Sequence, residues 1–151
     1  MGELTNLLNS NFVTTYDPFA EYFQSLPQWD HVDHITKLAS YVNCLDQPFW
    51  ILQFKKALVR MVACTVGGIV NRIIMVFVGE GQEKGKSELV RFLCPPTLQP
   101  YYKEDKMKDS KDAEIALAEN FIWNLEELDQ LNRKEVSEIK DIISRKRVKQ
   151  R

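Results

Sequence analysis

The triplet Gly85-Lys86-Ser87 is the part of this sequence best suited to chemistry, and it lies within VFVGEGQEKGKSELVRFL at residues 76–93. It matches the end of the phosphate-binding pattern G-x-x-x-x-G-K-[ST]. In such a loop, backbone N–H groups converge on phosphate oxygens, the lysine reaches the β- and γ-phosphates, and the hydroxyl holds Mg²⁺. The pattern therefore predicts ATP and Mg²⁺ as cofactors, bound by Gly81, Gly85, Lys86 and Ser87.

The first glycine of that pattern is replaced in this chain. Glu80 occupies the position, with Gly79 and Gly81 on either side of it. A side chain there restricts positive φ and brings a carboxylate towards the anion, whereas the flanking glycines can supply the flexible turns. The alternative interpretation is a surface loop on which Lys86 is simply solvated.

A nucleotide hydrolase also needs acidic groups at the end of a neighbouring strand. Glu126 and Glu127 follow the apolar run that begins at Phe121. Glu126 is forty residues beyond Lys86. That spacing accommodates a helix and a return to a parallel sheet. We expect one carboxylate, Glu126, to orient Mg²⁺ together with Ser87, and Glu127 to polarise the attacking water. The catalytic candidates are thus Lys86, Glu126 and Glu127; the alternative is an acidic turn or a solvated helix face.

The elements around these residues must place them at one edge of a sheet. The run RIIMVFVG at residues 72–79 predicts a short strand buried on both faces, and residues 86–93 predict a helix that Pro95-Pro96 ends. The polar residues 101–111 are expected to form an exposed loop. Residues 121–128 fit either a helix or a buried strand, and periodicity alone leaves that choice open.

Helix signals are clear in the rest of the chain. Asp17-Pro18, Asp33 and Asp46 each open an apolar periodic stretch, and Gly67-Gly68 ends the third one. Asp112 is expected to cap a short helix, and Asn132 a longer final one. The fold class predicted is α/β: a helical N-terminal region, 1–70, followed by the front half of a P-loop core with a short parallel sheet, 71–151.

Composition limits the classes of protein that fit. A chain of 151 residues with 44% hydrophobic and 27% charged residues is long enough for one domain with a core. Three cysteines without a C-x-x-C pair support neither a disulfide framework nor a zinc ribbon. With no signal peptide and no long apolar run, we expect a cytoplasmic protein.

The charge is unevenly spread along the chain. The last eight residues, SRKRVKQR, carry five basic and no acidic side chains, whereas the net charge of the whole chain is −1. A basic end on an acidic body is typical of polyanion binding, and a solvated chain end is the simpler alternative.

The chain resembles the virulence-associated E family, P-loop proteins of phages, plasmids and genomic islands that are related to superfamily-three helicases and AAA+ ATPases. The resemblance spans roughly residues 17 to 151. It depends on SLPQWDHVDHI, FKKALVRMVAC, GQEKGKSELVRFLCPP and ALAENFIWNLEELDQLNRKEVSEIKDIISRKRVKQR. The chain departs from the family pattern at His31, where glycine is usual, at Glu88, where Ser or Thr is commoner, and at Glu126, where Asp is usual.

The resemblance implies an ATP-hydrolysing, helicase-like motor module of a mobile-element replication protein. It also implies DNA as a partner, a homo-oligomer in the full-length form, and Arg145, Arg147 and Arg151 as nucleic-acid contacts. Because such ATPase domains continue with further strands, we expect this core to be truncated. Two other functions stay open: a nucleotide-gated interaction or switch module with little turnover, and a helical scaffold in which GKS is incidental.

Overall fold

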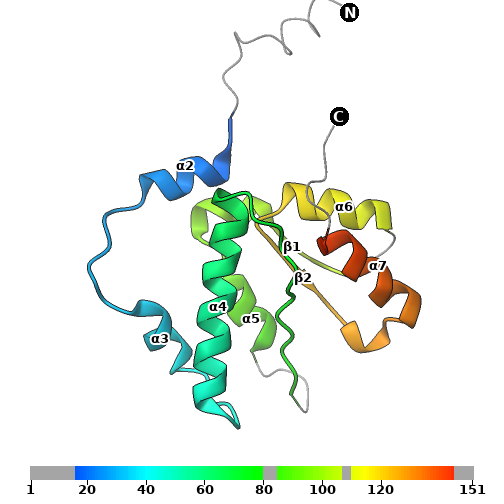
Figure 1. The fold of residues 1–151 in the computed structure, drawn as a ribbon, viewed down its shortest axis with the longest axis horizontal. Coiled ribbons are helices and arrows are strands. Elements are labelled where there is room, and N and C mark those ends of the chain that lie inside the picture. Colours follow the sequence, from blue (N-terminus) through cyan, green and yellow to red (C-terminus); the bar gives the residue numbers. More distant parts are fainter. Residues whose placement is uncertain (1–15, 80–84, 107–109, 145–151) are drawn as a thin grey trace, which may run out of the picture.

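The computed structural model describes residues 16–79, 85–106 and 110–144. Helices surround a small two-stranded sheet (Figure 1). The described elements are the α-helices α2 (Pro18–Ser25), α3 (His34–Ala39), α4 (Gln47–Val66), α5 (Lys86–Phe92), α6 (Ser110–Glu119) and α7 (Arg133–Ser144), the strands β1 (Tyr102–Asp105) and β2 (Ile122–Leu125), and the 3-10 helices η1 (Pro96–Tyr101) and η2 (Leu128–Gln130).

Side-chain caps explain where the first three helices begin. The Asp17 carboxylate accepts hydrogen bonds from the backbone N–H groups of Phe19 and Ala20, both at 3.0 Å. Asp33 caps α3 through the N–H of Thr36, and Asp46 caps α4 in the same way. An N-cap carboxylate satisfies amides that have no partner within the helix. These three predicted helix starts are confirmed.

The sheet consists of β1 and β2, which run parallel with Tyr102 opposite Ile122 and Asp105 opposite Leu125. Helix α6 lies between them in the chain and forms the crossover that parallel strands require. Residues 122–125 are therefore a strand, which settles the choice that periodicity left open. The prediction of an exposed loop across residues 101–111 is wrong, because Tyr102–Asp105 is β1 and Ser110 already begins α6.

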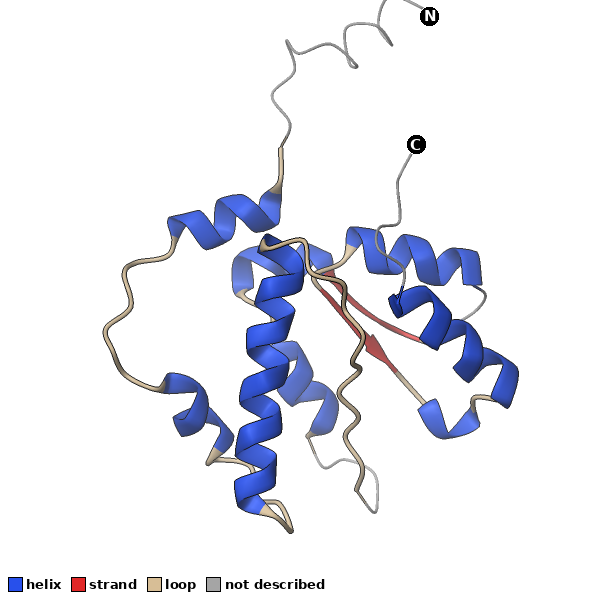
Figure 2. Cartoon of the chain, in the orientation of Figure 1, coloured by secondary structure: helices blue, strands red, loops and turns tan. Residues whose placement is uncertain are grey.

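The predicted buried strand at residues 72–79 is also wrong. This segment is extended but belongs to no sheet (Figure 2), and its aliphatic side chains are open to solvent, with Ile73 56% and Val78 92% exposed. A strand needs a neighbour to satisfy its backbone groups. None of the described residues pairs with this segment, and a cavity separates it from β2.

Two small cores hold the helices in place. Ala39 and Phe54 are fully buried where α3 packs on α4, and the ring of Trp50 packs at a tilt against that of Phe54, with ring centroids 4.8 Å apart. Ala113, Ala116, Ile139 and Ile142 are buried between α6 and α7.

The two helices of the second core begin differently. Helix α7 begins with the predicted cap at Asn132, whose side chain accepts from the N–H groups of Lys134 and Glu135. Helix α6 begins at Ser110, two residues before the predicted cap, so Asp112 lies in its first turn.

Candidate nucleotide site

Gly85 lies directly before α5 in the left-handed conformation, with φ +70° and ψ +18°. Glycine adopts this conformation without the steric cost that a Cβ would bring. No side chain among the described residues caps the helix start, and Leu89 donates its N–H to the carbonyl of Gly85. The first amides of α5 are thus oriented together at a turn, as a phosphate-binding loop requires. Gly81 lies outside the described residues.

Lys86 and Ser87 are the first two residues of α5, and both are partly buried. Among the described residues, no ion pair or hydrogen bond occupies the Lys86 ammonium group or the Ser87 hydroxyl. An ammonium group and a hydroxyl on the first turn are the groups that would hold phosphate and a magnesium ion.

Glu126 and Glu127 immediately follow β2, at its carboxyl end. The N–H of Glu126 donates to the carbonyl of Asp105 at 3.2 Å, which continues the pairing of the two strands. Glu127 has φ +55°, a value uncommon for a residue with a side chain, and its carboxylate forms an ion pair with Lys106. The expected position at a strand end is therefore correct for both glutamates.

The two halves of the predicted site belong to different elements, the start of α5 and the residues that follow β2. Among the described residues, no ion pair joins Lys86 to Glu126 or Glu127. In Figure 1 the extended segment that leads to the loop and strand β2 both run downward in that view. Arg145, Arg147 and Arg151, the predicted nucleic-acid contacts, lie outside the described residues.

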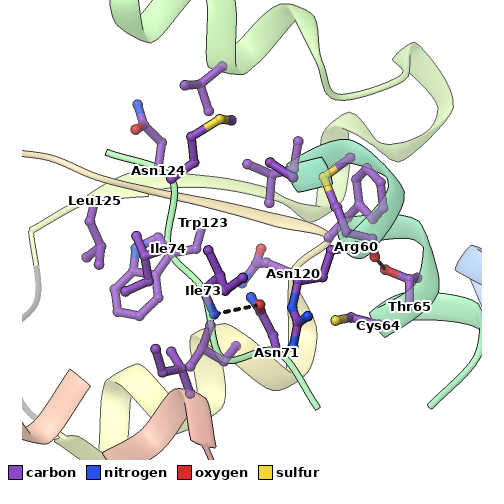
Figure 3. A pocket seen from close by; sticks show the side chains of 18 of the residues that line it. Arg60, Cys64, Thr65, Asn71, Ile73, Ile74, Asn120, Trp123, Asn124 and Leu125 are labelled. Atoms are coloured by element: carbon purple, nitrogen blue, oxygen red, sulfur yellow. Dashed lines mark hydrogen bonds between the residues drawn. The ribbon is translucent and has the colours of Figure 1, made fainter. Parts of the chain in front are cut away.

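A cavity of about 630 Å³ lies between the extended segment 69–77 and strand β2 (Figure 3). Residues 120–125 and most of residues 69–77 line it, together with parts of α4, α6 and α7. Arg60 of α4 donates to the carbonyl of Val70 at 3.0 Å, whereas its buried Nε has no partner among the described residues. The sheet edge at β2 and the segment 69–77 therefore face each other across a largely apolar gap.

Sequence reasoning missed a polar cluster that joins α5 to the sheet. Glu104 of β1 accepts from Arg91 Nη2 at 2.7 Å and from the Tyr102 hydroxyl at 2.8 Å. Arg91 and then Tyr102 hold the pKa of the Glu104 carboxyl below its usual range. Burial and Glu104 raise the pKa of Tyr102 to about 12. The sequence held one signal for this cluster. In a strand, residues two apart lie on one face, so Tyr102 and Glu104 share a face once residues 102–105 are known to be a strand.

The Virulence-associated protein E-like domain model matches residues 23–151 of this sequence. The chain belongs to the virulence-associated protein E-like family. No curated protein matches the chain, and no solved structure does. Membership of this VapE-like family suggests a protein associated with the replication of mobile elements.

The match covers every predicted site residue of this VapE-like chain, from Gly81 to Arg151. It also covers His31, the position at which we expected glycine in such proteins. His31 has φ +64°, in the left-handed region that glycine occupies most easily. The ring of Trp29 packs against that of His31 at 4.8 Å. Within residues 16–79, 85–106 and 110–144, no helix is long and apolar enough to cross a membrane.

Proposed function

We propose that this VapE-like chain is the ATP-binding and ATP-hydrolysing module of a mobile-element replication protein of the primase-helicase type. The observation that carries the proposal is the left-handed Gly85 followed directly by a helix that opens with Lys86 and Ser87. This is the local geometry that lets backbone amides and a lysine surround phosphate oxygens. The parallel strand β2, which Glu126 and Glu127 directly follow, supports the proposal independently.

In this proposal each side chain has one task. Lys86 would bind the β- and γ-phosphates, and Ser87 and Glu126 would hold Mg²⁺. Glu127 would polarise the water that attacks the γ-phosphorus and accept its proton, and the γ-phosphoryl group would pass from the bridging oxygen to that water, leaving ADP and phosphate. Hydroxyl and carboxylate oxygens are the ligands that Mg²⁺ prefers, so the donor set fits the ion.

The proposal extends to DNA and to oligomers of the full-length protein. Arg145, Arg147 and Arg151 belong to the last eight residues, which carry five basic and no acidic side chains. Such a segment neutralises phosphates of a nucleic-acid backbone without reading its sequence. We propose that the motor acts on DNA as a ring or cluster of subunits, with these arginines towards the DNA.

Calorimetric titration with Mg-ATP tests nucleotide binding. We expect binding by the wild type and a loss of about tenfold to a hundredfold in affinity for Lys86→Ala, because hydrogen bonds to charged groups contribute about 1.5–3 kcal/mol. Lys134→Ala is the matched control, since Lys134 is also near the start of a helix and 86% exposed. Equal affinities for wild type and Lys86→Ala, or no binding by either, would contradict the ATP site.

One observation favours a second function, a nucleotide-gated switch with little turnover. The Glu127 carboxylate is already paired with Lys106, so it must leave this partner before it can polarise a water. In a switch, Glu127 would stay paired with Lys106 when nucleotide binds, and ATP would be hydrolysed slowly.

Turnover in the full-length protein, with and without single-stranded DNA, separates the motor from the switch. For a motor, Glu127→Gln is expected to reduce turnover by about a hundredfold or more, in the range that loss of a general base causes. Glu138→Gln, which alters a comparable Lys–Glu pair on α7, should leave it unchanged. If wild type and Glu127→Gln hydrolyse ATP equally slowly, the switch is the better account.

A further inference from the structure

Glu104 is the centre of a polar contact that spans three elements. Its side chain is only 18% exposed, and one of its oxygens, Oε2, accepts from both Arg91 and the Tyr102 hydroxyl. The Arg91 guanidinium also lies over the Tyr102 ring, 5.8 Å from its centroid. Two donors on one oxygen, with a ring that limits where the arginine can move, hold this carboxylate in a defined position.

Glu126 reaches the same contact from β2. Glu104 pairs with Asn124 in the register of the sheet, and side chains two residues apart lie on one face, so Glu104, Asn124 and Glu126 share a face. Glu104 and Glu126 are thus diagonal neighbours on that face, and Glu126 is among the groups that act on the pKa of the Glu104 carboxyl. Two neighbouring carboxylates repel each other unless a cation compensates them. Arg91 is the cation at this contact.

Arg91 connects this contact to the nucleotide-binding helix. It lies on α5, the helix that begins with Lys86 and Ser87, and its partner Glu104 lies on β1. A shift of α5 therefore moves the guanidinium that binds Glu104. The contact joins the helix of the phosphate loop to the glutamate at the end of β2 through side chains alone.

We propose that Glu104 is a positioning residue that, held by Arg91 and Tyr102, fixes the carboxyl group of Glu126 and couples it to α5. The proposal rests on the proposed function, in which Glu126 orients Mg²⁺. Groups that hold a metal-orienting carboxylate in place typically change metal affinity by about tenfold to a hundredfold when they are removed.

The link itself can be tested without nucleotide. Carbon-detected NMR spectra of the glutamate side chains at neutral pH are compared for wild type and Arg91→Gln, a variant of a residue whose side chain is 57% exposed. We expect the carboxyl resonances of Glu104 and Glu126 both to shift, because Arg91 donates to Glu104 at 2.7 Å and Glu126 is the neighbour of Glu104 on the same face of the sheet. A Glu126 resonance that is unaffected by Arg91→Gln would overturn the link.

The positioning role is tested by the affinity for ATP, measured with Mg²⁺ and with EDTA. Mg²⁺ should raise the affinity of Glu104→Gln for ATP by about tenfold less than it raises that of wild type. In EDTA the two proteins should bind ATP equally well. Asp105→Asn is the control, because Asp105 is on the same strand but the opposite face, where it binds Trp123 Nε1 at 2.8 Å. Arg91→Lys keeps the positive charge and should retain part of the gain.

The outcomes separate the two claims. A wild type whose affinity for ATP does not change with Mg²⁺ would overturn the proposed role of Glu126 and, with it, that of Glu104. A wild type that gains affinity with Mg²⁺ while Glu104→Gln gains just as much would overturn the positioning role alone. Equal losses with Mg²⁺ and with EDTA would mean that Glu104 supports the fold rather than Glu126.

Discussion

Asp33 has two structural roles, and one of them, an ion pair, requires its carboxylate to be ionised. It caps α3 through Thr36 and forms an ion pair with Lys55 of α4 at 2.5 Å. Lys55 first, and then Thr36, lower the pKa of Asp33 from 3.8 to about 2. The segment that links α2 to α4 is therefore held to α4 by a charged contact at the protein surface.

This contact predicts a specific pH dependence of stability. Because the pKa of Asp33 is depressed in the folded state, its contribution is complete above about pH 4 and is lost as the pH falls through about 2. Asp33→Asn should thus have a lower free energy of unfolding than wild type near neutral pH, and the difference should narrow below pH 4. Urea unfolding at a series of pH values measures it.

Lys55→Met removes the same ion pair from its other side. The free energy of unfolding of Lys55→Met should therefore approach that of wild type over the same range of pH. A difference that stays constant from neutral pH to pH 2 for both variants would show that the ion pair does not stabilise the fold.

At the scale of single elements, helix α7 depends on a reciprocal cap. Asn132 accepts from the N–H groups of Lys134 and Glu135, and the Glu135 carboxylate accepts from the N–H of Asn132 at 2.8 Å. Together these bonds satisfy amides on both sides of the helix start.

Asn132→Ala should lower the free energy of unfolding by about 1 kcal/mol, the usual cost of losing an N-cap. Equilibrium unfolding in urea gives this value. Asn43→Ala, at an exposed asparagine outside the helices, is expected to cost much less. Equal losses for the two variants would mean that the cap does not determine the stability of α7.

The helices were predictable because their signals are local. Asp17, Asp33, Asp46 and Asn132 each bind amides two or three residues further along the chain, so the residues that define the helix start lie together in the sequence. The position of Glu126 and Glu127 after an apolar run was predictable for the same reason. Gly85 required only a turn before a helix, and it has the positive φ that such a turn uses.

The strands were harder because their partners are distant in the sequence. Strand β1 carries Tyr102, Lys103, Glu104 and Asp105, which show no apolar pattern, and it exists because its backbone pairs with β2. Residues 72–79 have a strong strand pattern and no pairing partner among the described residues. Residue propensity thus missed a real strand and predicted a false one, because backbone pairing across the sheet decides the structure at both places.

The Arg91–Glu104 contact was missed because it depends on pairing as well. Its two residues are thirteen positions apart and belong to different elements, so nothing in the sequence places them together. Only when Tyr102–Asp105 is known to be a strand does the alternation of its side chains show which of them faces α5.

At the scale of the whole molecule, the proposed site is made of two parts that different segments carry. Gly85, Lys86 and Ser87 are carried by the start of α5, and Glu126 and Glu127 by the end of β2. The cavity of about 630 Å³ between β2 and residues 69–77 separates the backbones that lead to these two parts. In the proposed site, a bound nucleotide with its metal ion must therefore contact both parts at once.

Aromatic contacts connect the helical N-terminal region to the same sheet. Phe19 and Phe23 of α2 pack against Phe121, just before β2, with ring centroids 5.9 and 6.0 Å apart. Phe19 also meets Tyr101 edge to face at 5.2 Å, at the start of β1. Helix α2 thus packs at the amino ends of both strands, which leaves their carboxyl ends, where Glu126 and Glu127 lie, free of this contact.

The most direct test of the central claim is paramagnetic NMR with Mn²⁺ in place of Mg²⁺, in the presence of ATP. A bound Mn²⁺ broadens the amide signals of residues close to it. We predict that the signals of residues 85–87 and of residues 125–127 broaden together, and that Lys86→Ala removes both effects. Broadening of only one of these groups, or of neither while ATP is bound, would contradict a shared nucleotide site.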